Sequence, residues 1–225
     1  MEESGESSGP RLPVGPRELK QERAVRTRER ILAAAATAFA AKGFPAVTIL
    51  DVAETAGMTK GAVYFHYENK EALALAVTER FYLRLEEIAD TVEPLGLPPL
   101  GSVAELLLRT ATAFRDETLV QAGARLQLER HLIGVRLPLP YEAYTGLITS
   151  WLTKEHEADT RGGLPPPGTL ATVLVSAFFG AQHISWVLND RADLVKRTTD
   201  LVRTIIPSAS EDMKSCPSAP RGEHG

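Results

Sequence analysis

The sequence is poor in cysteine and aromatic residues, and it has no long uninterrupted apolar run. Its 225 residues include a single cysteine, Cys216, which excludes an internal disulfide and a thiolate metal cluster. Pro, Gly, Gln and His interrupt the most apolar segment, Leu164 to Trp186, so no run approaches the roughly 20 residues of a membrane span. Met1 to Pro10 lacks the basic and apolar stretches of a secretory signal. We therefore expect a reduced, cytoplasmic protein without a membrane partner.

Motifs of enzymes and metal sites are absent as well. The sequence has no nucleophile elbow, no phosphate-cradling Gly-rich loop and no HExxH pair. Its five histidines are scattered, and no two are spaced four residues apart as zinc ligands on one helix would be. We predict no metal, no cofactor and no catalytic residue, so the protein is not expected to be an enzyme.

The residues that are present predict an all-α protein. Hydrophobic residues make up 44% of the chain, enough for a sizeable core, and they recur at helical spacing between breaks at Gly and Pro. Nine helices are expected, at about 27–42, 48–56, 59–64, 69–91, 102–115, 117–132, 141–160, 169–188 and 192–205. A capping box at Ser102 and Glu105 is expected to open the fifth. Residues 1–19 and 208–225, rich in Gly, Pro, Ser and charged residues, are predicted to be disordered tails.

Charge is unevenly distributed along the chain. Residues 20–70 hold eight Lys or Arg and five Asp or Glu, a net charge of 8 − 5 = +3. The whole chain carries −4, so the remainder carries −4 − 3 = −7. A basic segment on an acidic body suggests that one end meets a polyanion, although solvated helix faces also produce such an imbalance.

The basic segment has the pattern of a helix-turn-helix. A first helix is followed by two short ones, and Gly57 in the turn between them tolerates a positive φ. Val52, Ala53 and Val63 are expected to face inward. The third helix can then project its exposed residues into a major groove, namely Thr59, Lys60, Gly61 and Tyr64. The amide groups that begin the second helix, together with Thr48, suit a phosphate oxygen.

Residues 48–70, TILDVAETAGMTKGAVYFHYENK, resemble the DNA-binding signature of the TetR family of repressors. The resemblance implies that Lys60 and Tyr64 contact the groove. It implies phosphate-contacting or positioning roles for Thr48, Thr59, His66 and Lys70. Phe65 and Tyr67 would pack inward, and an arm with Arg23, Arg26 and Arg28 would extend toward the DNA backbone or minor groove. From the residues alone, Tyr64 could instead be a packing aromatic, His66 a helix cap and Lys70 a surface lysine.

The resemblance extends into residues 71–207. The phrases QAGARLQ, LPLPY and AFFGAQH, beginning at Gln121, Leu137 and Ala177, are similar to the γ-butyrolactone receptor group of actinobacteria, and most to its receptors for furan and butenolide signals. The resemblance implies a helix-turn-helix domain at 20–68 and a ligand-binding and dimerisation domain at 69–207. It also implies a repressor of antibiotic biosynthesis genes that releases a pseudopalindromic operator when a small diffusible autoregulator binds.

The same resemblance implies a ligand site with one polar end. Tyr82, Gln127 and Tyr141 fall at positions that match the furan-type receptors, and phenols and an amide can donate to a carbonyl or carboxylate. An apolar lining is expected from Leu85, Leu106, Phe114, Leu126, Phe178 and Phe179. Many receptors of the group have a ligand-site tryptophan just after the PY motif. Here the chain continues with Tyr144 and reaches tryptophan only at Trp151, so either residue could contact ligand, or Trp151 could be ordinary core.

Three further alternatives stay open on the sequence. The last two helices, with Val173, Ala177, Phe178, Ile184, Leu194, Leu201 and Ile205, are expected to pair in a homodimer, but they could close a monomer core. The protein could be a pseudo-receptor that answers to an antibiotic or intermediate instead of an autoregulator. It could also be a constitutive DNA binder with an occluded pocket.

Overall fold

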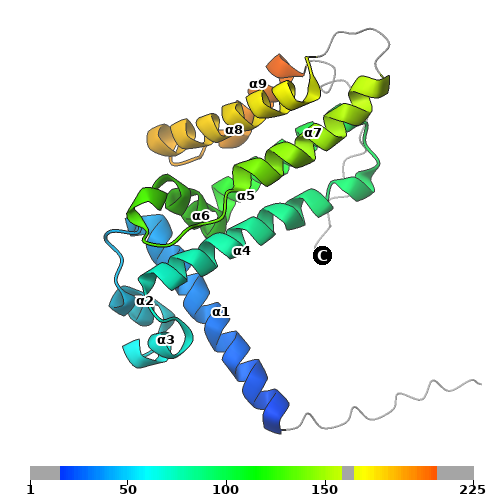
Figure 1. Ribbon diagram of the computed structural model, residues 1–225. Coiled ribbons are helices and arrows are strands. Elements are labelled where there is room, and N and C mark those ends of the chain that lie inside the picture. Colours follow the sequence, from blue (N-terminus) through cyan, green and yellow to red (C-terminus); the bar gives the residue numbers. More distant parts are fainter. Residues whose placement is uncertain (1–15, 159–164, 207–225) are drawn as a thin grey trace, which may run out of the picture.

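A computed structural model describes residues 16–158 and 165–206 (Figure 1). Among these residues it contains α-helices and two single-turn 3-10 helices and no strand, which confirms the predicted all-α class. The α-helices are α1 (Pro16–Lys42), α2 (Ile49–Ala56), α3 (Lys60–His66), α4 (Lys70–Asp90), α5 (Pro99–Asp116), α6 (Thr118–Leu128), α7 (Pro140–Ala158), α8 (Pro167–Asn189) and α9 (Leu194–Ile205). The 3-10 turns are η1 (Glu93–Leu95) and η2 (Arg130–Leu132).

Helix α1 begins much earlier than predicted. It starts at Pro16, a residue favoured in the first helical turn, and runs through charged residues of good helix propensity. Residues 16–19, which we had assigned to a disordered tail, are therefore helical, whereas 1–15 and 207–225 lie outside the described residues. The predicted arm is wrong for the same reason, because Arg23, Arg26 and Arg28 lie on α1. The amino-terminal half of α1 projects away from the other helices (Figure 1).

The predicted capping box at Ser102 is also wrong. Helix α5 begins at Pro99, three residues earlier, because a proline at the first position pre-sets the helical φ. The Ser102 hydroxyl donates to the carbonyl of Leu97 at 3.3 Å instead of capping. The predicted sixth helix ends at Leu128, and the 3-10 turn η2 continues it to Leu132.

Two hydrophobic clusters form the interior. One joins α1, α2 and α3 to the start of α4 and to α6, around Phe39, Val63 and Leu126. The other joins α4, α5, α7, α8 and α9, around Phe81, Phe114 and Phe178. Helices α4 and α6 contribute to both clusters, so they connect the amino-terminal helices to the carboxy-terminal bundle.

Helix α8 is the most apolar helix of the described residues. Its best 18-residue window has a mean hydropathy of 1.4, which by length and composition alone would suffice for a membrane span, contrary to the expectation from its sequence. It packs against α7 and α9, and 39% of that window is buried. Its outer face exposes Val173, Ile184, Val187 and Leu188.

Candidate DNA interface and ligand site

The helix-turn-helix forms as its local sequence predicts. Thr48 caps α2 in a capping box with Asp51, and Gly57 ends α2 with a left-handed φ of 64°. Thr59 caps α3 by accepting from the amide of Ala62 at 3.2 Å. Val52, Ala53 and Val63 are buried between the helices, which confirms that they set the crossing of α2 and α3.

The outer face of α3 exposes aromatic and basic side chains. Thr59, Lys60 and Gly61 are exposed, and the Lys60 ammonium lies 5.7 Å from the ring centroid of Tyr64. Tyr64 is 47% exposed and Phe65 is 84% exposed, so the expectation that Phe65 packs inward is wrong. Val63 and the buried Tyr67 are four residues apart and occupy the inner face, whereas Phe65 lies half a turn away. That spacing could have revealed Phe65 as a candidate contact.

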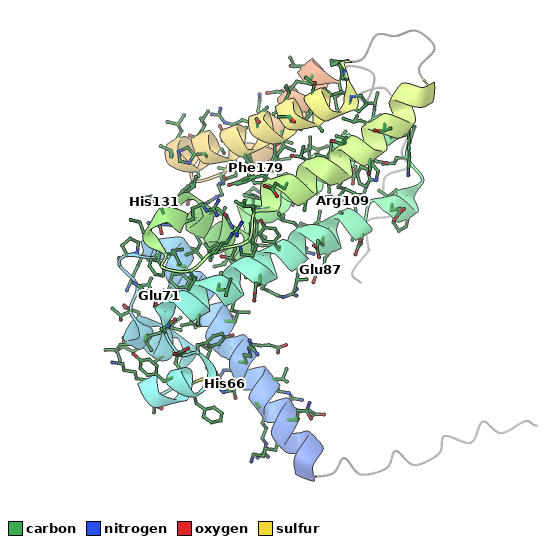
Figure 2. All side chains as sticks on the ribbon, in the orientation of Figure 1. His66, Glu71, Glu87, Arg109, His131 and Phe179 are labelled. Atoms are coloured by element: carbon green, nitrogen blue, oxygen red, sulfur yellow. The ribbon has the colours of Figure 1, made fainter. Side chains whose placement is uncertain are left out.

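Other cations near this face are committed to holding the domain together. The Lys70 ammonium donates to the carbonyl of Phe44 at 2.8 Å, and Arg30 donates to the carbonyl of Ala56 at 2.9 Å. Arg28 donates to the Tyr67 hydroxyl at 3.3 Å and raises its own pKa by that contact. His66, at the end of α3 in Figure 2, is half-buried, and its ring lies edge-on against Phe65 at 5.2 Å.

Inside the carboxy-terminal bundle, the polar residues predicted for ligand come from three helices. Tyr82 lies on α4, Gln127 on α6 and Tyr141 on α7. The Gln127 amide nitrogen donates to the carbonyl of Pro138 at 2.9 Å, which leaves its oxygen buried without a partner among the described residues. The Tyr82 hydroxyl is also buried without a partner there. Unpaired buried polar atoms are costly, and each asks for a partner that the described chain does not provide.

A continuous series of aromatic rings lies beside these polar groups. Phe81 contacts Phe114 at 6.0 Å between ring centroids, and Phe114 contacts Phe178 at 5.7 Å. Phe179, on α8 in Figure 2, lies 4.8 Å from the ring of Tyr141. Phe114 and Phe178 are fully buried, so the structure places them in the core, and Trp151 is partly buried against it.

A hollow of about 270 Å³ opens between α4 and α7 next to this interior. Tyr82 and Tyr144 line it, together with Leu85, Pro140, Ala143 and Leu147, while Gln127 and Tyr141 do not. The Tyr144 hydroxyl already pairs with that of Thr110. The structure therefore brings Tyr82 and Tyr144 to one hollow and leaves Gln127 and Tyr141 outside its wall.

Burial keeps the phenols of this region neutral. It raises the pKa of Tyr82, Tyr141 and Tyr144 above the ordinary tyrosine value. The cation of Arg130 opposes the rise in pKa at both Tyr82 and Tyr141. At neutral pH the three hydroxyls thus remain protonated, and those of Tyr82 and Tyr141 can donate to a ligand oxygen.

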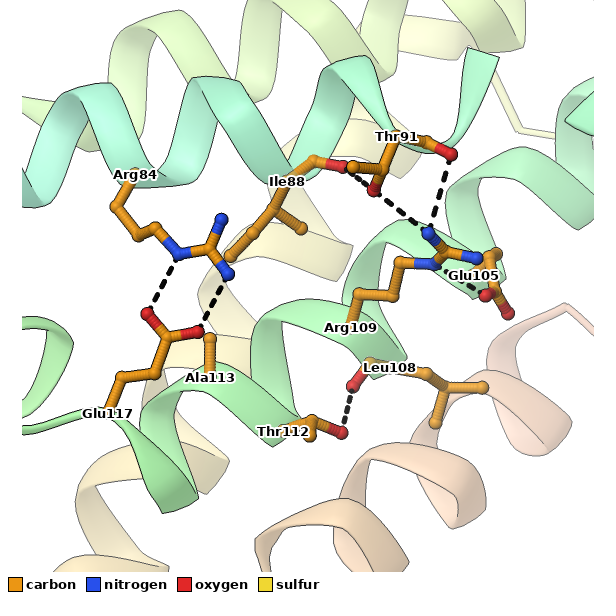
Figure 3. Close-up of a pocket in the computed structure, with 9 residues that line it drawn as sticks. All are labelled: Arg84, Ile88, Thr91, Glu105, Leu108, Arg109, Thr112, Ala113 and Glu117. Atoms are coloured by element: carbon orange, nitrogen blue, oxygen red, sulfur yellow. Dashed lines mark hydrogen bonds and ion pairs between the residues drawn. The ribbon is translucent and has the colours of Figure 1, made fainter. Parts of the chain in front are cut away.

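A second hollow, of about 410 Å³, lies between α4 and α5 (Figure 3). Its charged groups are already paired: Arg84 donates to Glu117 through two nitrogens at 2.8 Å, and Arg109 donates to Glu105 at 2.6 Å. Paired charges hold the two helices together and leave little polar capacity for a ligand. The α4–α7 side is therefore the better candidate.

Comparison with known proteins agrees with this arrangement. Residues 31–77 match the family of bacterial regulatory proteins named tetR. Over 83% of its length, the chain is 31% identical to TylP, a TetR regulator from Streptomyces fradiae, whose structure it covers to 87% with a TM-score of 0.62. The chain belongs to the TetR family.

Two further relatives concern signalling. A solved structure, described as the molecular basis for control of antibiotic production by bacterial hormones, is 45% identical, with a TM-score of 0.75 and 82% and 97% of the two chains covered. The A-factor receptor protein of Streptomyces griseus is 33% identical over 84% of this chain. The chain spans 66% of that receptor, just under two thirds of its length.

Proposed function

We propose that this protein is a ligand-responsive transcriptional repressor that controls antibiotic biosynthesis genes in the cytoplasm. One observation carries the proposal: a helix-turn-helix and a bundle with unpartnered buried polar atoms share one chain and two helices, α4 and α6. Its effector is a small diffusible autoregulator of the furan, butenolide or γ-butyrolactone type. The similarity to the A-factor receptor supports this class of effector.

Double-stranded operator DNA is contacted by the outer face of α3 and the start of α2. Lys60, Tyr64 and the missed residue Phe65 read bases in the major groove, where an apolar ring also suits a thymine methyl group. Thr48 and Thr59 lie at helix starts whose amides suit phosphate oxygens. Lys70 and His66 position these helices, because their side chains are turned toward the domain.

A homodimer presents two such faces to a pseudopalindromic site. The exposed apolar residues of α8 recur at helical spacing, as expected for a helix that packs against its copy. Of the residues predicted for this interface, Val173 and Ile184 remain exposed, whereas Phe178 and Leu194 are buried in the single chain. The interface therefore rests on the outer face of α8.

The effector binds among Tyr82, Gln127 and Tyr141, with its apolar part against the aromatic series. Contact with Tyr82 acts on α4, and α4 begins at Lys70, directly after α3 and the cap at Asn69. A tilt of α4 therefore changes the separation of the two α3 helices in the dimer. The ligand shifts this equilibrium only by its differential affinity for the two states, about 1–3 kcal/mol in typical coupling.

A gel shift tests the proposal, using DNA from upstream of the protein's own gene, with and without extract of the producing culture. We expect binding that the extract abolishes. Binding that the extract leaves intact contradicts release by an autoregulator, and release by the pathway's antibiotic alone identifies a pseudo-receptor. Absence of binding at moderate salt contradicts the DNA-binding role.

A pair of variants locates the effector site in the same assay. Gln127→Leu is expected to bind DNA and to resist release, because the ligand loses a polar partner. Gln121→Leu is the matched control on the same helix, since that amide donates to the carbonyl of Arg115 at 2.8 Å. Equal release of both variants would place the site elsewhere.

A further inference from the structure

A fourth polar side chain in the bundle has no assigned role. Gln182, on α8, is only 3% exposed, and its amide nitrogen is buried without a hydrogen-bond partner among the described residues. An unpaired buried donor is unfavourable for folding, so a purely structural glutamine would be expected to pair. The position asks for an acceptor that arrives from outside the chain.

The neighbours of Gln182 place it beside the candidate ligand site. Gln182 follows Phe178 by four residues and Phe179 by three, which puts all three on one side of α8. Phe179 packs against Tyr141 at 4.8 Å. One turn further along α8, the ring of Trp186 lies 5.5 Å from the guanidinium of Arg125, on α6. Gln182 is thus bracketed by the α7 contact and the α6 contact.

The α6 side of this region carries the complementary polar atom. Gln127 lies two residues after Arg125, and its amide nitrogen donates to Pro138, two residues before α7 begins. Its oxygen is left as an unpartnered acceptor, whereas the unpartnered atom of Gln182 is a donor. The interior therefore offers one donor and one acceptor from two glutamines, and the Tyr82 hydroxyl can serve as either.

We propose that Gln182 is a ligand-binding and specificity-determining residue, which donates from its amide nitrogen to a carbonyl or carboxylate oxygen of the effector. Gln127 accepts from a hydroxyl group of the same molecule. The effector class is therefore a small molecule with an apolar tail, an oxygen acceptor and a free hydroxyl. This inference rests on the proposed function, because it deepens the description of the same site.

The closing experiment uses full-length protein, operator DNA and synthetic probes: a γ-butyrolactone and a furan carboxylate, each bearing a free hydroxymethyl group, and their methyl ethers. The probe concentration that half-releases DNA is measured by fluorescence anisotropy. Gln182→Leu is expected to raise it about tenfold for the better probe, the cost of one lost hydrogen bond and its stranded partner. The methyl ethers, which cannot donate to Gln127, are expected to release wild-type protein poorly.

A thermal melt separates binding from a structural role. Removing an unpaired buried donor is expected to leave the Tm of Gln182→Leu unchanged or to raise it by a few degrees, while the response to the probe falls. Gln121→Leu, the control on α6, is expected to change neither. A lowered Tm with an unchanged half-release concentration would show a structural residue and overturn the inference.

The outcomes distinguish the two proposals. If a probe releases wild-type protein and Gln182→Leu responds equally, the inference on Gln182 is wrong and the proposed function stands. If neither probe releases wild-type protein, the effector class is wrong, and both proposals fall together.

Discussion

The contact between α6 and the end of α1 gives the sharpest quantitative prediction. Arg125 donates to the carbonyls of Ala40 and Ala41, both at 3.0 Å, and to Glu129 at 3.0 Å. Glu129 in turn accepts from the backbone amide of Phe44 at 2.6 Å. This pair of charged side chains therefore fastens the ligand-binding bundle to the DNA-binding helices.

Arg125→Met keeps the aliphatic volume and removes the charge and the hydrogen bonds. Charge-assisted hydrogen bonds contribute about 1.5–3 kcal/mol each, but Arg125 and Glu129 are 22% and 20% exposed, so solvent screens part of this. We expect the free energy of unfolding to fall by about 2–3 kcal/mol, near the lower limit for breaking a buried pair. For a chain of this size, that lowers Tm by about 5 to 10 °C.

The assay is urea unfolding of each variant at one protomer concentration, because dimer stability depends on concentration. Arg109→Met is the matched control: Arg109 also pairs with a glutamate four residues away, Glu105, but mainly within α5. We expect the control to lose about 1 kcal/mol or less. An equal loss in the two variants would refute the reasoning, as would additivity of Arg125→Met with Glu129→Gln in a double-mutant cycle.

Three further predictions concern α3, α8 and α6. Phe65→Ala should leave the free energy of unfolding within about 0.5 kcal/mol, because the ring is 84% exposed, and should weaken operator binding in anisotropy titrations; unchanged binding would remove Phe65 from the interface. Ile184→Glu should yield monomers in sedimentation and abolish operator binding, whereas a dimeric mass would place the interface elsewhere. Gly123→Ala should lower the free energy of unfolding by about 1–3 kcal/mol in urea, since its new methyl group would collide with the Phe81 ring; full stability would show that this crossing can relax.

Much of the fold follows from local sequence signals. The capping residues Thr48, Thr59 and Asn69 and the left-handed Gly57 fix the helix-turn-helix and the start of α4 as predicted. The early start of α1 was missed because charged residues without an apolar stripe were interpreted as a tail. Helix propensity alone favours their helical form.

The candidate sites were less predictable, because they depend on which face of each helix is covered. The exposure of Phe65 follows from the burial of Val63 and Tyr67, which requires the packing of α3 against α1 and α2. The pairing of Lys70 with the Phe44 carbonyl joins residues 26 positions apart. Gln182 has no sequence motif of its own, and its unpartnered nitrogen emerges only when α8 is packed on α7.

The most direct test of the account is the dissociation constant of the operator complex, measured by anisotropy with and without a saturating hydroxymethyl γ-butyrolactone or furan carboxylate. The account predicts that the ligand raises this constant by about 5- to 150-fold, the range of typical allosteric coupling. It also predicts that operator DNA weakens ligand binding by the same factor. Equal dissociation constants, with ligand shown to be bound, would contradict the claim that ligand binding in the bundle releases DNA.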